Sequence, residues 1–303
     1  MIKVLETAEN LIQQMLDKNI KFELFTQDDA KIFLINNSYY KKVTSYQNNF
    51  HTYIEDGKKK YSDLDFAYLV ELSRLDMEFR FLVMKMCLNF EHALKVLLIN
   101  KCLENKEDGY EILENYFNNR PDAKDEIIKH ANNSYCQELI LANQERMPVW
   151  VFLEVTSFGG LCHFCKFLSK KGYFNEWEID LFFNVRNFRN AAAHSHCLFS
   201  QLIRTNNNEI NYKVRNYVAQ IDDITKTEKK NNLKSKCIND FVTLLFAFEY
   251  YVKSEGIIGH TKKEIDELFN ERMLQKKEYF VNCNSVKNAY NFVKKILDKW
   301  CTD

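Results

Sequence analysis

Residues 185–196 carry the side chains best suited to acid–base and phosphate chemistry. The run reads Val185-Arg186-Asn187-Phe188-Arg189-Asn190-Ala191-Ala192-Ala193-His194-Ser195-His196. Histidine exchanges protons near neutral pH, so His194 can take a proton from a ribose 2′-hydroxyl or give one to a leaving 5′-oxygen. Arginine binds phosphate and stabilises the charge that builds on it, a role open to Arg189. These residue types together indicate metal-independent cleavage of RNA.

Helical periodicity gives these polar residues a face of their own. At about 100° per residue, one apolar stripe forms from Trp177, Leu181, Val185, Phe188 and Ala192. Asn190 and His194 fall one turn apart on the opposite side. Arg186 lies toward that side, while Arg189 flanks the stripe. A plain solvated helix face satisfies the same spacing, so the spacing alone does not separate surface from site.

Three consecutive alanines precede His194 and would let a second helix approach closely. Two copies of this helix meeting across a two-fold axis would gather two arginines and two histidines in one cleft. The pattern therefore predicts a homodimer with a composite site.

The composition predicts an all-α fold in a reducing cytoplasm. The chain has 303 residues, 46% of them hydrophobic, but only 7 Gly and 2 Pro, which favours long helices over turn-rich sheets. Nine scattered cysteines do not form a small disulfide framework. Charges within the first ten residues and along 79–100 argue against a signal peptide and a membrane span. The 42 basic and 42 acidic residues balance, so an RNA site requires a local basic cluster.

The elements that must position the site are helices. Apolar residues recur at spacings of three and four from about 64 to 103, which predicts a long central helix. A second seam is formed by Val70, Met77, Phe81, Met84 and Leu88, and predicts burial on more than one side. Pro148 begins a new helix, and Gly159-Gly160 interrupts it. Asn175 and Glu178 form a capping box that begins the helix carrying the polar run.

Three segments are predicted along the chain. Residues 1–203 form a helical bundle, and 237–303 form further helices that pack on the same bundle. Between them, 204–236 is rich in Asn, Lys and Thr, with weak strand-like alternation over 210–218, and is predicted to be a long polar loop. Its lysines are a candidate accessory contact for RNA, although a charge run is usually solvated surface. These lysines are Lys226, Lys229, Lys230, Lys234 and Lys236.

Four blocks of this sequence resemble the Abi (abortive-infection) family of bacteria over most of residues 10–200. The first is the tyrosine-rich segment Tyr39-Tyr40-Lys41-Lys42-Val43-Thr44-Ser45-Tyr46. The second is Leu72-Ser73-Arg74-Leu75-Asp76-Met77-Glu78-Phe79-Arg80 with Phe90-Glu91-His92-Ala93-Leu94-Lys95. The third is Pro148-Val149-Trp150 with Glu154-Val155-Thr156-Ser157-Phe158-Gly159-Gly160-Leu161, and the fourth is 185–196.

The resemblance implies a HEPN-like helical bundle with additional N- and C-terminal helices and few or no strands. It also implies a homodimeric, metal-independent endoribonuclease that needs no cofactor and serves phage defence, or a toxin restrained by an antitoxin, which could itself be RNA. Arg189 and His194 match the family's catalytic pair, and Asn190 matches the polar residue after the arginine. This chain departs from the family pattern after His194, so Arg186 or His196 is expected to supply the auxiliary phosphate contact.

Other motifs have competing explanations. Cys162-His163-Phe164-Cys165 has the spacing of half a zinc site, but no second pair follows, so packing is preferred to a metal. The tyrosines beside Lys41 and Lys42 resemble a single-strand RNA platform, but packing of the tyrosines against the central helix is the preferred explanation. Glu154 is expected to be a buried acid that pairs with an arginine.

Two further classes of function remain open on the sequence. The first is a non-catalytic RNA-binding module that holds a small structured RNA through the same phosphate contacts. The second is a scaffold that binds only protein.

Overall fold

The computed structural model describes residues 5–131, 134–202 and 210–302. The helices and strands are α1 (Ala8–Asp17), α2 (Gln27–Asn36), α3 (Tyr40–Val43), η1 (Thr44–Asn49), β1 (Thr52–Glu55), β2 (Lys58–Tyr61), α4 (Phe66–Glu104), α5 (Glu111–Asn119), α6 (Pro121–His130), α7 (Gln137–Ala142), α8 (Val149–Val155), α9 (Phe158–Ser169), α10 (Glu176–Ala193), η3 (Leu198–Gln201), α11 (Tyr212–Ala219), α12 (Lys226–Asn232), α13 (Lys236–Tyr251), α14 (Glu255–Asp266), η4 (Glu267–Glu271), η5 (Arg272–Leu274), η6 (Lys277–Phe280) and α15 (Asn284–Thr302). The predicted all-α class is confirmed.

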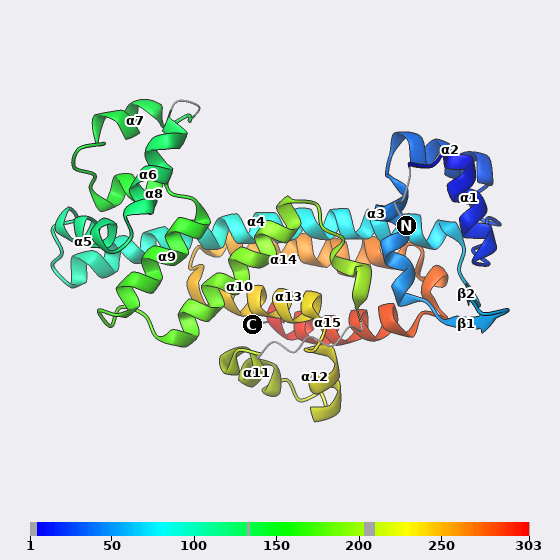
Figure 1. The fold of residues 1–303 in the computed structure, drawn as a ribbon. Coiled ribbons are helices and arrows are strands. Elements are labelled where there is room, and N and C mark those ends of the chain that lie inside the picture. Colours follow the sequence, from blue (N-terminus) through cyan, green and yellow to red (C-terminus); the bar gives the residue numbers. More distant parts are fainter. Residues whose placement is uncertain (1–4, 132–133, 203–209, 303) are drawn as a thin grey trace.

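Helix α4 is the axis of the fold. Asp65 caps it by accepting a hydrogen bond from the Ala67 N–H at 2.8 Å, and its 39 residues extend for about 58 Å. Helices α5 to α8 gather at one end, α1, α2 and the two strands lie at the other, and α10, α13, α14 and α15 lie along its length (Figure 1). The predicted central helix over 64–103 is therefore confirmed.

One face of α4 differs from the prediction. Val70 of the expected second seam is buried, but Met77, Phe81 and Leu88 are 40%, 63% and 53% exposed. The neighbouring helices α10, α13 and α14 cover the other sides of α4 and leave this one to solvent. The apolar pattern alone could not reveal this, since it does not say which apolar positions receive a partner.

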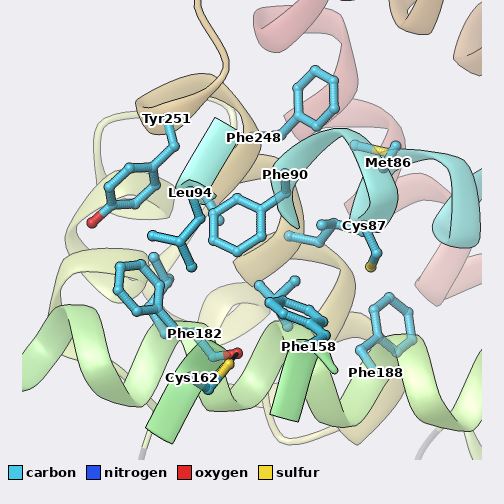
Figure 2. Close-up of a cluster of buried hydrophobic side chains, with 14 of the residues drawn as sticks. Met86, Cys87, Phe90, Leu94, Phe158, Cys162, Phe182, Phe188, Phe248 and Tyr251 are labelled. Atoms are coloured by element: carbon cyan, nitrogen blue, oxygen red, sulfur yellow. Dashed lines mark hydrogen bonds between the residues drawn. The ribbon is translucent and has the colours of Figure 1, made fainter. Parts of the chain in front are cut away.

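The core surrounds Phe90 in the middle of α4. Its ring contacts Phe158 of α9, Phe182 of α10 and Tyr251 of α13, with centroids 5.6–6.2 Å apart. Figure 2 shows these aromatic side chains converging between α4 and the helices that pack on it. The contact fixes α9 and α10 against α4, and these two helices carry the end of the third sequence block and most of the fourth.

Local sequence signals account for both ends of helix α10. The predicted capping box is present: the Asn175 N–H donates to Glu178 Oε2 at 2.9 Å. The predicted apolar stripe is buried against the core, with Leu181 and Val185 fully buried. At the other end the Ser195 N–H donates to the Ala192 carbonyl and the His196 N–H donates to the Ala191 carbonyl. Ser195 has a left-handed φ of 54°, so the helix closes with a Schellman motif.

The sheet found in the described residues is a small two-stranded hairpin. Strands β1 and β2 pair antiparallel, with Thr52 opposite Tyr61 and Glu55 opposite Lys58. Asp56 and Gly57 both have positive φ, 49° and 71°, as a type I′ turn requires. Asp-Gly is a residue pair that favours this turn.

The predicted loop over 204–236 is wrong for most of its length. Residues 210–232 include the helices α11 and α12, while 203–209 lie outside the described residues. The strand-like alternation over 210–218 is also wrong, since Val214 and Val218 lie one helical turn apart and are both fully buried in the core. Asn211 caps α11, and Thr225 with Glu228 forms the capping box of α12. Short helices form here because α13 and α15 offer them surfaces to pack against.

Candidate functional site

Two histidines lie side by side where α10 ends. His194 is the residue that caps the helix, and both it and His196 are exposed. The centroids of their imidazole rings are 6.1 Å apart, with 34° between the ring planes. The Schellman motif fixes the backbone between them, so the spacing of the two rings follows from the way the helix closes.

The guanidinium of Arg189 is held on three sides. Its Nη1 donates to the Asn190 Oδ1 at 3.1 Å, and its Nη2 lies 3.8 Å from the Glu91 Oε2. The ring of Phe158 lies 6.0 Å from the guanidinium carbon. The side chain is 28% exposed, so the charge is oriented by the protein and still reached by solvent. An arginine held in this way is suited to bind a phosphate.

Asn190 connects Arg189 to His194. Its side-chain oxygen accepts from Arg189, and its backbone carbonyl accepts the His194 N–H at 2.9 Å. The predicted residues Arg189, Asn190, His194 and His196 therefore lie together at one end of α10. No contact joins the guanidinium to an imidazole within the described residues.

Glu91, the acid that lies against Arg189, was not among the predicted site residues. Burial raises the pKa of the Glu91 carboxyl, and the charges of Lys95 and Arg189 oppose the rise. The signal was available in the sequence, because Glu91 stands next to Phe90 on the inner side of the predicted central helix.

Glu154, the acid expected to be buried, is exposed, so that expectation is wrong. Helix α8 turns the Glu154 side of its surface to solvent while Val151, Phe152 and Leu153 face the core.

Asp76 anchors the segment that follows the two histidines. One of its carboxylate oxygens accepts the Phe199 N–H at 2.9 Å, and the other accepts from Tyr46 Oη at 3.0 Å and from Arg80 Nε at 3.2 Å. Burial raises the pKa of Asp76, while these three donors lower it. Tyr46 is fully buried, which confirms the packing alternative for this tyrosine. Its phenol is held between α4 and the chain after α10.

The other predicted RNA contacts lie at the edges of this cluster. Lys42 is near it, because its carbonyl accepts from Cys197 Sγ at 3.7 Å, one residue beyond His196. Lys41 is exposed on α3. The Arg186 guanidinium lies along its own helix, 4.7 Å from the ring of Phe183, and donates to Asn187 Oδ1 at 2.8 Å. The structure thus separates Arg186 from the histidines and brings Lys42 close to them.

The half zinc motif is part of the core. Cys162 and Cys165 are fully buried, and the Cys162 thiol donates a hydrogen bond to the Phe182 carbonyl at 3.6 Å. Burial raises the pKa of Cys162 to about 12, which keeps the thiol protonated near neutral pH. His163 packs against Phe183. In the part of the chain that the structure describes, no three His, Cys, Asp or Glu side chains are grouped as a metal site would require.

The four sequence blocks meet at this end of α10. Tyr46 of the first block binds Asp76 of the second, Glu91 of the second lies against Arg189 of the fourth, and Phe158 of the third packs beneath that arginine. Gly160 of the third block also matters, because a Cβ there would clash with the side chain of Thr156. The residues that carry the resemblance are therefore those that build and support one polar site.

The fold and the site define an all-helical protein with an arginine, an asparagine and two histidines at the end of a core helix. The model of the Abi-like protein family matches residues 32–200, more than half of the chain and all four blocks. The chain belongs to this family, whose name points to a role in abortive infection. No curated protein and no solved structure matches this chain. Among the described residues, no helix is long and apolar enough to cross a membrane.

Proposed function

We propose that this protein is a metal-independent endoribonuclease of the HEPN type, acting in abortive infection as a phage-defence enzyme or as a toxin restrained by an antitoxin. The observation that carries the proposal is the pair of exposed imidazoles at the end of the same helix that carries a guanidinium held in place by the protein. Histidine and arginine together supply the proton transfers and the charge stabilisation that phosphodiester transfer needs.

The reaction uses the ribose as the nucleophile. One imidazole removes the proton of the 2′-hydroxyl, and the 2′-oxygen attacks the adjacent phosphorus. The bond from phosphorus to the 5′-oxygen breaks, and the second imidazole gives that oxygen a proton. The products are a 2′,3′-cyclic phosphate and a 5′-hydroxyl, so no water, metal or cofactor is consumed. The centroid separation of 6.1 Å between His194 and His196 suits an acid and a base on opposite sides of one phosphate.

Arg189 stabilises the charge that develops on the phosphate oxygens. Asn190 and Glu91 act as positioning residues, because they orient the guanidinium while leaving part of it exposed. In the proposed homodimer, the exposed Ala193 and half-buried Ala191 allow two α10 ends to approach each other. Such a pair gathers two arginines and four histidines around one RNA strand.

The experiment compares purified wild-type protein with Arg189→Ala, His194→Ala and His196→Ala on labelled single-stranded RNA in EDTA. Each substitution is expected to lower the cleavage rate by about 100- to 10,000-fold. His51→Ala is the matched control, since His51 is exposed and lies on the N-terminal side of β1. Full activity in folded Arg189→Ala and His194→Ala proteins would contradict the assignment.

Two further readouts test the finer points. Cyclic phosphate ends identify the 2′-hydroxyl mechanism, whereas RNA that is shifted but intact supports a non-catalytic RNA-binding module. Mixing Arg189→Ala chains with His194→Ala chains tests the composite site, because mixed dimers retain one arginine and one His194. Activity should return on mixing, and its absence in verified mixed dimers would contradict a shared site.

A further inference from the structure

Lysines are concentrated in two segments of this neutral chain. Residues 226–236 and 284–302 contain nine lysines and only two acidic residues, Glu228 and Asp298, while the whole chain has a net charge of zero. The sequence separates the segments by almost fifty residues. A strong local field arises only if folding places them next to each other.

The structure places them next to each other. Helix α12 packs on α15, and Lys295 of α15 joins them by donating to Glu228 at 2.8 Å and to the Asp223 carbonyl at 2.8 Å. Two other lysines also have acidic partners, Lys294 with Asp298 and Lys236 with Asp240. Lys299 donates to the Gln220 carbonyl at 3.4 Å. Five lysines have no carboxylate partner among the described residues. They are Lys226, Lys229, Lys230, Lys234 and Lys287.

A groove of about 750 Å³ runs between these helices. Lys234, Lys294 and Lys295 lie along it together with Glu228 and Asp298, the carboxylates that pair with Lys295 and Lys294. Four asparagines also line it, Asn231, Asn232, Asn288 and Asn291. A primary amide both donates and accepts hydrogen bonds, as the edges of unpaired bases require. Ammonium groups beside such amides suit the phosphates of the same strand. The lining therefore combines the two kinds of contact that a single strand of nucleic acid offers.

The groove also reaches the chain that leaves the histidine pair. Leu202 is part of its wall, and the Leu202 N–H donates to Asn49 Oδ1 at 3.1 Å. Leu202 is six residues beyond His196, in the segment that Asp76 anchors through Phe199. A strand held in the groove therefore lies against the same segment that carries His196.

We infer that the groove between α12 and α15, here called the lysine–asparagine groove, binds a single-stranded part of the RNA substrate. The inference rests on the proposed function for the identity of the ligand, and it adds a second contact region outside the histidine site. Lysines bind the phosphates and asparagines bind base edges. An acidic protein segment is the competing occupant, but the groove adjoins the segment that carries His196, where the proposed reaction on RNA takes place.

The test measures binding of a fluorescein-labelled 20-nucleotide RNA of mixed sequence by anisotropy, in EDTA, over a range of salt concentrations. The full-length chain carries His194→Ala so that the RNA stays intact. Adding Lys234→Gln and Lys294→Gln, at two lysines that line the groove, is expected to weaken binding at least tenfold. The slope of log affinity against log salt should fall by about 1.4, since each phosphate contact on a single strand contributes about 0.7. The matched control is Lys58→Gln with Lys59→Gln, two exposed lysines of the hairpin.

The outcomes separate this inference from the proposed function. Loss of affinity and slope in the groove variant, with the hairpin variant unchanged, supports the groove even if the wild-type protein cleaves no RNA. Wild-type affinity and slope in the groove variant overturn it, even if His194→Ala abolishes cleavage. Asn288→Ala with Asn291→Ala should weaken binding without changing the slope. Displacement of the RNA by poly-glutamate at equal charge concentration overturns the assignment to RNA.

Discussion

Replacing Asp76 with alanine should cost more stability than any other single change near the site. The side chain is fully buried, and its two oxygens accept from Tyr46, Arg80 and the Phe199 N–H. Alanine leaves all three donors without their acceptor, and one of them is a charged guanidinium that is 7% exposed. The loss therefore includes an unpaired buried charge.

The size of the effect follows from these contacts. Removing one partner of a buried ion pair costs about 3–5 kcal/mol, and we expect Asp76→Ala to lower the free energy of unfolding by that amount. Tyr46→Phe is the graded comparison, because it removes one hydrogen bond and leaves the Arg80 and Phe199 contacts in place. Its expected cost is about 1–2 kcal/mol.

Urea denaturation followed by circular dichroism measures both values. The midpoint should shift while the dependence on urea stays constant, which indicates a change in stability without a change in the surface exposed. A loss below about 1 kcal/mol for Asp76→Ala would show that the three donors find other partners, and the reasoning about this anchor would be wrong.

Two further predictions concern the ends of the site. Burial raises the folded pKa of Glu91 above its ordinary value of 4.5, so the folded state holds this proton more tightly than the unfolded chain. The Glu91 contribution therefore favours folding most below pH 4.5 and is lost as pH rises through the folded pKa. We compare the free energy of unfolding of wild type with that of Glu91→Gln. The difference, wild type minus variant, should decrease as the pH rises from 4.5 to 7, and an increase would contradict the raised pKa of Glu91. Ser195→Gly should stabilise the protein by about 0.5–1 kcal/mol in thermal or urea unfolding, because φ is 54° there; a loss would show that the serine side chain matters more than the backbone.

Local sequence determined α10 and its polar end. A capping box requires residues three apart, an apolar stripe requires a period of 3.6, and both are complete within residues 175–194. Arg189, Asn190 and His194 could therefore be placed on one helix end without knowledge of the fold. The low glycine and proline content settled the all-α class in the same way.

Tertiary structure decided everything that joins distant segments. Glu91 meets Arg189 from another helix, Asp76 binds both Tyr46 and Phe199, and the lysines of α12 lie against those of α15. An apolar period shows that a face is buried but not which helix covers it, so the exposed side of α4 and the buried side of α11 were both predicted incorrectly. Partners across the fold are selected by packing of the whole chain, which no local window of residues contains.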